Sequence, residues 1–381
     1  MASSLIQPER NFTLWAVLLL AAGIGFWAER TRWGAKLSGA AVTILVTFIL
    51  SNLKIIPVSS PTYDVVWSDL VPLAIPLLLF KADLVRIVRE TAPILVAYLL
   101  GIVGTVIGTI GAYYLLPLGA DGWQWAGVFC ASYMGGGINF SPTAKTLELD
   151  SENLLSAGVA ADNLVMTLYL LLLFTLPSIK LMRRIFPIKL SARNINLGQI
   201  NISNSQGQET LRLIDISLSL SISALVCSGA YGVADWLGLG EIRILLITAL
   251  MVALATIFPH DLEKIKSADK IGMLLLQIFF AAIGASANIE AVLAMRPILF
   301  LFAALIVAIH LLILFLAGRL LRLELVELAI ASNASVGGPA TAAAMAKAKG
   351  WDRLIVPGIV CGTLGYGFAS FIGVSLGNFL R

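Results

Sequence analysis

The residues best suited to chemistry are Asp162 and Asn163, which lie inside an otherwise apolar stretch. An ionisable side chain at membrane depth is costly and by default indicates a functional site. We expect Asp162 to bind Na⁺ or take up a proton, with Asn163 as a neutral co-ligand. A structural alternative stays open, in which the aspartate caps a helix or pairs with a lysine. About 200 residues later the equivalent positions are Gly362 and Thr363, so the charge would come from one half of the chain only.

Two glycine pairs interrupt strongly apolar regions and are surrounded by hydroxyl and amide side chains. They lie in ASYMGGGINFSPTAKT (131–146) and ASNASVGGPATAAAMA (331–346). Backbone that leaves the helix at membrane depth is tolerated only inside protein or beside a wet cavity. Such breaks at matching places in two halves point to a transporter's binding site, where helix ends offer partial charges. The candidate ligands and glycines are Ser132, Gly136, Gly137, Asn139, Ser141 and Thr143, then Ser332, Asn333, Ser335, Gly337, Gly338 and Thr341.

Other polar groups in apolar segments are secondary candidates. Thr363 is one of them, and Gln277 is expected to line the same cavity, as are Ser286 and Asn288. His310 is expected to be a hydrogen-bonded core residue. For the glycines and serines the alternative is that they merely let helices pack closely. The sequence shows no nucleophile motif, phosphate loop or metal cluster, so we expect neither an enzyme nor a cofactor beyond a possible Na⁺.

Composition identifies the class of protein that must position these residues. Hydrophobic residues make up 59% and charged residues 13%, and the mean hydropathy is +0.92. A soluble domain carries about 25% charged residues, so the chain is a polytopic membrane protein. The net charge of +4 comes from basic residues in short loops and does not indicate a nucleic-acid partner. The cysteines lie in apolar segments without disulfide or metal spacing, and we expect them to pack.

Twelve apolar segments can be marked along the chain. They cover residues 12–28, 37–56, 67–80, 92–116, 123–146, 154–181, 213–237, 244–258, 271–287, 298–316, 328–346 and 354–380. A polar run over 183–212, rich in Asn, Ser and Gln, predicts a flexible linker. The predicted organisation is therefore a first membrane repeat (1–182), a cytoplasmic linker (183–212) and a second membrane repeat (213–381).

The two halves match at one spacing, which favours duplication. The matching pairs, each about 200 residues apart, are Ile55–Pro57 with Ile257–Pro259, Gly136–Gly137 with Gly337–Gly338, and Gly158 with Gly358.

The distribution of the 26 Lys and Arg residues tests the topology. If all twelve segments crossed the membrane, the two sides would carry 14 and 12 basic residues. If both glycine segments enter and leave on one side, the division becomes 20 to 6, which obeys the positive-inside rule. This favours re-entrant hairpins and five spans per half, and an odd number of spans inverts the second half. Both termini would then lie outside and the linker inside. A crossing pair of broken helices remains the alternative.

The segments FCASYMGGGINFSPTAKTLEL, ASNASVGGPATAAAMAKAKGW and VPGIVCGTLGYG resemble the YjcL-like family of membrane proteins, domain of unknown function 819. The likeness covers nearly the whole chain. The resemblance implies a carrier of the cation:proton antiporter and anion transporter superfamily in the bacterial plasma membrane, with a scaffold and a mobile core, working as an elevator-type homodimer. Asp162 and Asn163 resemble the acidic/asparagine pair that sodium/proton antiporters place on the helix after their broken helix. The family name carries no substrate.

The sequence therefore predicts an all-α polytopic membrane protein with two inverted-topology repeats, each of about five spans and one Gly-rich re-entrant or broken helix. The expected function is secondary active transport of a small organic solute, coupled to Na⁺ or H⁺. Helix N-termini at the glycine loops would favour a carboxylate on that solute. Segments four to six and ten to twelve would form the core, and the others the scaffold. A Na⁺/H⁺ antiporter without an organic substrate and a non-transporting regulatory or assembly protein are the alternatives.

Overall fold

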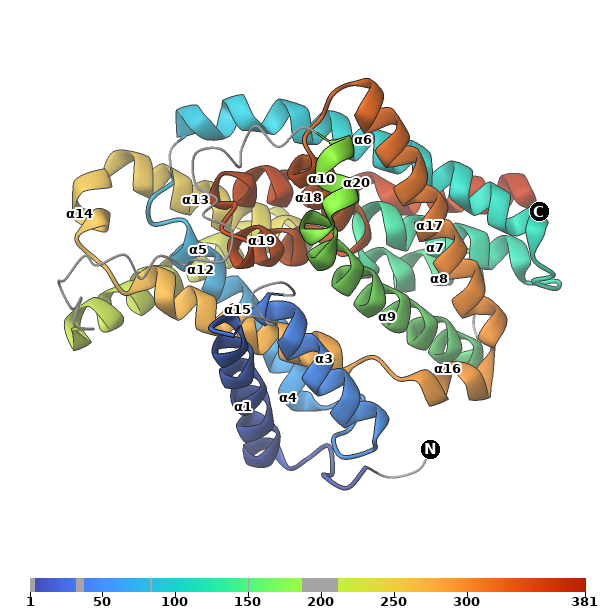
Figure 1. Ribbon diagram of the computed structural model, residues 1–381, viewed down its shortest axis with the longest axis horizontal. Coiled ribbons are helices and arrows are strands. Elements are labelled where there is room, and N and C mark those ends of the chain that lie inside the picture. Colours follow the sequence, from blue (N-terminus) through green and yellow to red (C-terminus); the bar gives the residue numbers. More distant parts are fainter. Residues whose placement is uncertain (1–3, 32–37, 83, 150, 187–211) are drawn as a thin grey trace.

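The computed structural model describes residues 4–31, 38–82, 84–149, 151–186 and 212–381. Within these ranges the chain forms helices and turns and contains no strand. Most of the predicted polar linker, residues 187–211, lies outside the described residues. Figure 1 shows the resulting packing of helices.

The first half forms helices close to the predicted segments. They are α1 (Asn11–Glu29), α3 (Gly39–Asn52), α4 (Pro61–Val65), the π-helical η1 (Val66–Leu70), α5 (Val71–Leu78), α6 (Leu84–Leu115), α7 (Gly122–Gly135), η2 (Gly137–Asn139), α8 (Phe140–Thr146), α9 (Glu152–Thr175), η3 (Leu176–Ser178) and α10 (Lys180–Ile185). Ser60 begins α4 by accepting a hydrogen bond from the Thr62 backbone N–H, 3.2 Å away. The helix α6 begins at Leu84, eight residues before the predicted segment, and contains the apolar span Thr91–Leu115.

The second half also forms helices joined by turns in its described residues. It contains α12 (Leu213–Leu237), η4 (Gly240–Ile242), α13 (Arg243–Ile257), α14 (Pro259–Glu263), α15 (Ala268–Ala285), α16 (Ile289–Met295), α17 (Pro297–Leu320), α18 (Leu325–Val336), α19 (Gly338–Ala348), η5 (Asp352–Leu354) and α20 (Ile355–Leu380). Gly238, at φ +67°, ends α12 in the left-handed region that glycine adopts freely. A reciprocal capping box between Glu324 and Glu327 begins α18.

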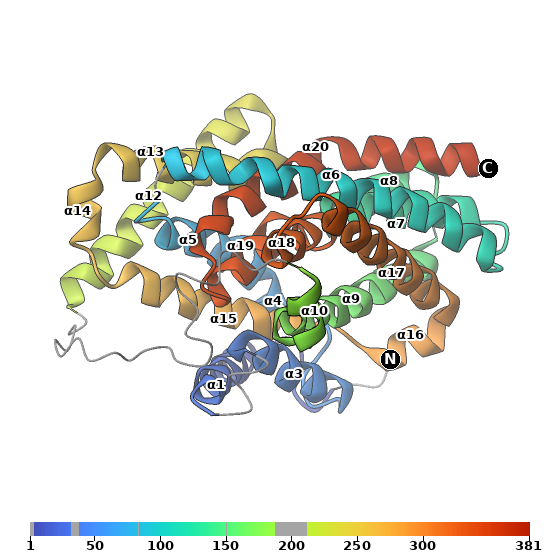
Figure 2. The same ribbon diagram turned by 45° about the horizontal axis from the view of Figure 1, so that its top comes forward.

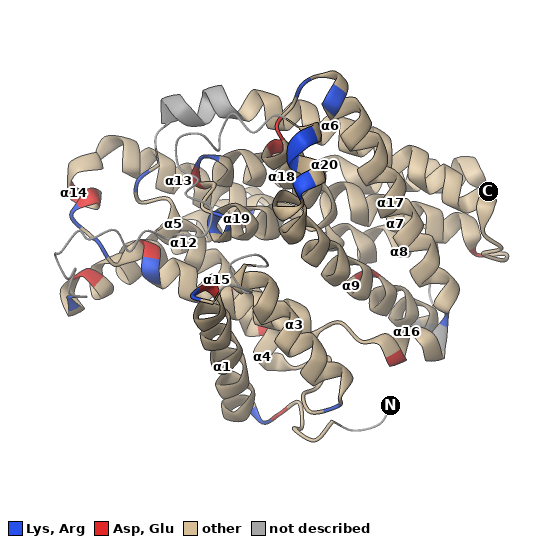
Figure 3. Cartoon of the chain, viewed as in Figure 1, with Lys and Arg blue, Asp and Glu red and all other residues tan. Residues whose placement is uncertain are grey.

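Seven of the described helices are long and apolar enough to cross a membrane. They include α1, α9, α12, α17 and α20, and three shorter apolar helices, α3, α13 and α18, accompany them. Figure 3 shows charged residues mainly at helix ends and in connections, which leaves long uncharged stretches along the helices. The chain is therefore a multi-pass membrane protein in contact with the lipid bilayer.

The helices pack in two groups. The α1 group consists of α1, α3, α4, α5, α12, α13 and α15, which contact one another extensively. The α17 group consists of α6, α7, α8, α9, α17, α18, α19 and α20. In Figures 1 and 2, α1 and α3 lie side by side next to α15, and α6 runs along the opposite edge of the molecule.

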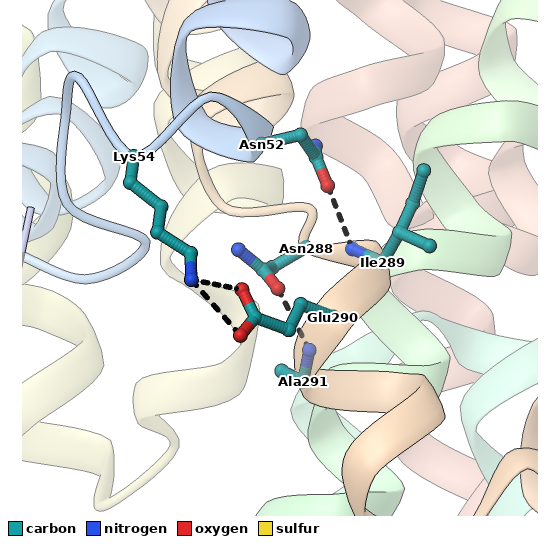
Figure 4. A network of polar contacts seen from close by, with 6 residues as sticks. All are labelled: Asn52, Lys54, Asn288, Ile289, Glu290 and Ala291. Carbon is teal, nitrogen blue, oxygen red and sulfur yellow. Dashed lines mark hydrogen bonds and ion pairs between the residues drawn. The ribbon is translucent and has the colours of Figure 1, made fainter. Parts of the chain in front are cut away.

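The short helix α16 connects the two groups and is fastened to the end of α3 (Figure 4). Asn52 accepts a hydrogen bond from the Ile289 N–H (2.8 Å) and donates one to the Ala287 carbonyl (2.9 Å). Lys54 pairs with Glu290 at 2.7 Å. Asn288, which the sequence placed near a cavity, caps α16 by accepting from the Ala291 N–H at 2.8 Å.

Candidate functional site

Each glycine segment folds back on itself as a hairpin of two short helices. In the first hairpin (α7, η2, α8), Gln124 near the start donates to the Leu147 carbonyl just after the end, at 2.8 Å. In the second hairpin (α18, α19), Glu324 before its start pairs with Arg353 after its end, at 3.5 Å. Both ends of each hairpin therefore lie together.

The two hairpins approach the middle of α20 from opposite directions. A methyl group added at Gly377 would lie 3.0 Å from the Trp123 carbonyl oxygen, at the open end of the first hairpin. Toward the other end of α20, a methyl group at Gly358 would lie 3.2 Å from the Ala342 side chain of the second hairpin. The closed ends of the hairpins lie between Gly358 and Gly377, so α20 runs along both hairpins and contacts each of them.

The closed ends of the hairpins touch through backbone. The Gly136 N–H donates to the Ser335 carbonyl at 3.0 Å. Gly136 and Gly338 adopt φ values of +79° and +86°, which L side chains rarely adopt. A Cβ at Gly136 would also lie 3.0 Å from the Gly338 Cα. Glycine is required here for both its conformation and its small size.

Asp162, on α9, faces the first hairpin beside this junction. The side chain is buried, and its Oδ1 accepts a hydrogen bond from Ser132 at 3.1 Å. A methyl group at Gly137 would lie 3.6 Å from Oδ2. Asp162 forms no ion pair within the part of the chain that the structure describes. A buried carboxylate without a positive partner needs a proton or a bound cation to offset its lost hydration.

Two further hydroxyls of the first hairpin are buried. The Tyr133 hydroxyl lies against the Asp162 carboxylate, and the Thr143 hydroxyl has no partner within the described ranges. Unsatisfied buried groups in a native structure call for an explanation such as an unseen ion or water. Sequence analysis missed Tyr133, because an aromatic residue in an apolar segment is indistinguishable from core; its position directly after Ser132 is the one available signal.

The second hairpin differs, because its polar groups already bond to one another or to neighbours. His310 Nδ1 lies 2.9 Å from the Gly101 carbonyl, which can only accept, so this nitrogen carries the proton. Nε2 then accepts from Ser332 (2.9 Å), and Ser332 accepts from Tyr169 (2.5 Å). His310 is thus the hydrogen-bonded core residue expected, and Ser332 holds α18 against α17 and α9.

The remaining polar groups of the second hairpin stabilise the hairpin itself. Thr341 donates to the Asn333 side chain at 2.9 Å, and Asn333 donates back to the Thr341 carbonyl at 3.1 Å. Ser335 donates to the Tyr133 carbonyl at 2.8 Å and so joins the two hairpins. A methyl group at Gly337 would lie 2.3 Å from the Thr341 hydroxyl, so glycine leaves room for this bond.

Other predicted residues lie apart from Asp162. Asn139 donates to the Gly135 carbonyl at 3.1 Å, Ser141 is exposed, and Thr363 donates to a carbonyl of its own helix at 2.8 Å. Gln277 lies in the α1 group, where it donates to Thr43 at 2.6 Å.

Asn163 faces away from the hairpins, into a cavity of about 150 Å³ between α9, η1 and α15. The sequence predicts that Ser286 shares a cavity with the glycine hairpins; it lines this separate cavity, whose described lining contains no hairpin residue. The full lining is Trp67, Asn163, Met166, Thr167, Ile283 and Ser286. Asp162 and Asn163 therefore serve adjacent but different environments.

Charged groups meet where the end of α19 reaches the α1 group. Lys347 pairs with Asp269 of α15 at 2.7 Å. Burial lowers the pKa of Lys349 to about 8; the charge of Glu29 opposes this shift and that of Arg183 adds to it. The second hairpin is thus held to α15 by a shielded ion pair.

Comparison with known proteins agrees with this membrane fold. The model of the family "Protein of unknown function (DUF819)" matches residues 16–381. The chain is 34% identical over 396 residues to the "Uncharacterized membrane protein YjcL" of Bacillus subtilis (strain 168), with 98% of each protein covered.

Proposed function

We propose, on the premise that this chain belongs to the DUF819 family of membrane proteins, that it is a secondary active transporter coupled to Na⁺ or H⁺. The observation that carries the proposal is Asp162, a buried carboxylate without a positive partner at the junction of two broken helices. Carboxylate and hydroxyl oxygens are ligands that hard cations prefer. Ser132 and Tyr133 supply hydroxyls next to Asp162.

An inverted-repeat, elevator-like architecture is part of the proposal. Its support is that Gly158 and Gly358 pack against the hairpins of their own halves, through Trp125 and Ala342 respectively. The positive-inside distribution agrees with hairpins that enter the bilayer from opposite faces. In this reading the α17 group is the mobile core and the α1 group the scaffold. The core carries the ion at Asp162 across the membrane together with a small organic solute, and the protein works as a homodimer in the bacterial plasma membrane.

The direct test compares the thermal stability of purified protein in Na⁺, K⁺ and choline at several pH values, for wild type and Asp162→Asn. A ligand that binds only the folded state stabilises it by RT ln(1 + [L]/Kd), about 2.7 kcal/mol at a hundredfold excess. We expect a Na⁺-specific rise in melting temperature that Asp162→Asn abolishes. For H⁺ coupling, the expected result is a pH-dependent melting temperature that only the wild type shows.

Asp235→Asn is the matched control, because Asp235 is an exposed aspartate that pairs with Arg243 at 2.7 Å. This variant should keep the response of the wild type. Responses to Na⁺ and pH that are the same in wild type and Asp162→Asn would refute the coupling site. If a pH gradient alone drives Na⁺ uptake into vesicles that contain the protein but no organic solute, the protein is instead an antiporter without an organic substrate.

A further inference from the structure

The cavity beside Asn163 lies between the two groups of helices. Asn163, Met166 and Thr167 come from α9, in the α17 group. The opposite wall comes from α15 of the α1 group and from η1, which connects α4 and α5 of the same group. Ligand pockets for drug-sized molecules measure about 300–1,000 Å³, so a cavity of about 150 Å³ suits a much smaller solute.

Asn163 has unused bonding capacity in this cavity, whereas the two hydroxyls of the lining already donate to carbonyl groups. Thr167 donates to the Ile283 carbonyl (3.4 Å), and Ser286 donates to the Ala282 carbonyl (3.0 Å). The Asn163 amide has no hydrogen-bond partner in the described part of the chain. An amide offers two N–H donors and a carbonyl acceptor, and leaving them unpaired in apolar surroundings costs free energy. A bound solute would satisfy them.

Trp67 supplies an aromatic wall from an unusual stretch of backbone. It lies in the π-helical segment Val66–Leu70, and its ring meets Phe279 edge-on, with centroids 4.7 Å apart. The π-helical turn is rare and is found often at functional sites. Trp67 is 40% exposed, so part of its surface is left uncovered by protein.

The electrostatics of the cavity disfavour an anion. Its lining contains no Lys, Arg or His. The helix α15 ends at Ala285 beside the cavity, and a helix C-terminus carries partial negative charge on its carbonyls. Asp162 adds a carboxylate one residue away on α9.

We propose that this cavity binds the transported solute, and that the solute is a small molecule with N–H donors and no net negative charge. The inference rests on the proposed transport function and identifies its substrate class. It replaces the carboxylate that the hairpin N-termini suggested, because the closed ends of the hairpins bond to each other, with the Gly136 N–H donating to the Ser335 carbonyl at 3.0 Å. Ion and solute then occupy adjacent faces of α9, which provides a short route for their coupling.

The test measures melting temperature in saturating Na⁺ at fixed pH with matched probes of three to six carbons, offered as amide, amine and carboxylate. Propionamide, propylamine and propionate form the smallest set. We expect amides or amines to stabilise the wild type and the matched carboxylates to have at least tenfold weaker apparent affinity. Asn163→Leu should weaken amide and amine binding at least tenfold while preserving the Na⁺ response.

Ser286→Leu is the second variant, because it fills the cavity from α15 and should also abolish solute binding if Asn163→Leu does not fold. Asn378→Leu, at an exposed position on α20, is the matched control. Tighter binding of carboxylates, unchanged binding in both cavity variants, or no response to any amide or amine would overturn the proposal. Solute binding that depends on Asn163 in a protein with no response to Na⁺ or pH would keep this site and refute the coupled transporter.

Discussion

Polar side chains in the two hairpins differ in how far their bonding capacity is used. Asn333 and Thr341 bond to each other, and Ser332 links His310 to Tyr169. Around Asp162, Ser132 donates a hydrogen bond to the carboxylate, the Tyr133 hydroxyl lies against it, and no positively charged side chain pairs with it in the described ranges. The carboxylate in front of the first hairpin therefore keeps unused bonding capacity, which the proposed ion would fill, whereas the polar groups of the second hairpin are bonded within the protein.

Replacing Ser332 by alanine tests this bonding. Ser332→Ala removes the hydroxyl that bridges His310 Nε2 and Tyr169, so two buried polar groups lose a partner. Each such loss costs about 1–3 kcal/mol, and we expect the melting temperature to fall by several degrees.

Thr363→Val is the control for this variant, since Thr363 is buried but bonds only to the Ile359 carbonyl of its own helix. It should change stability little. Equal stabilities of Ser332→Ala and Thr363→Val would contradict the bridging role. If Ser332→Ala keeps the Na⁺-dependent rise in melting temperature, Ser332 contributes to stability and not to ion binding.

At the scale of elements, α20 is shaped by the two hairpins that pack on it. A methyl group at Gly365 would lie 2.4 Å from the Tyr98 hydroxyl and 2.7 Å from the Met134 carbonyl oxygen. Tyr98 already donates to that carbonyl at 2.6 Å, so neither group can move away easily. Glycine at position 365 is therefore needed for α20 to pack against the end of α7.

Two alanine substitutions on the same helix separate packing from helix propensity. Gly365→Ala should destabilise the protein by at least 1–3 kcal/mol through overpacking. Gly367→Ala, two residues further on, meets nothing within 4 Å and should be neutral or stabilising, because alanine favours helix by about 1 kcal/mol. Thermal unfolding of the two variants measures the difference. Equal stabilities of Gly365→Ala and Gly367→Ala would show that the closed end of the first hairpin does not pack on α20 at Gly365.

The sequence predicts these elements well because apolar segments and glycine breaks are local signals. The segment predicted at 213–237 is α12, with the same bounds, and both glycine pairs do interrupt helices. The π-helical turn around Trp67 has no comparable signal. The sequence also gives no signal that Asp162 and Asn163 lie in different environments, because this depends on what packs against each face of α9. The cavity partners Ile283 and Ser286 lie more than 100 residues away in sequence, so only the fold brings them to Asn163.

At the scale of the whole molecule, an ion pair joins the two groups of helices near the end of α19. Lys347, whose side chain is 11% exposed, pairs across the boundary with Asp269 (39% exposed) at 2.7 Å, and it also pairs with Asp352 at 3.2 Å. Such shielding makes an ion pair stronger than one at the open surface. In an elevator-like cycle this pair would have to break whenever the core moves.

A double-mutant cycle measures this tie. The effects of Lys347→Met and Asp269→Asn on the free energy of unfolding should be non-additive, with a coupling of about 0.5–3 kcal/mol. The pair Lys264–Asp261, exposed within one helical turn, is the control and should show little coupling. Additive effects for Lys347 and Asp269 would mean that the pair does not hold the two groups together.

The packing of the first hairpin against α20 also sets an order of events while the protein is being made. The hairpin ends at Thr146, but its main neighbour is the last helix, and 235 residues (147–381) must still be translated. At about 5–20 residues per second this takes roughly 10 to 50 s. During that time the broken helix and the Asp162 carboxylate lack their final neighbours. A membrane insertase or chaperone that shelters polar backbone from lipid would therefore act on the first half of the nascent chain, and the second half would complete it.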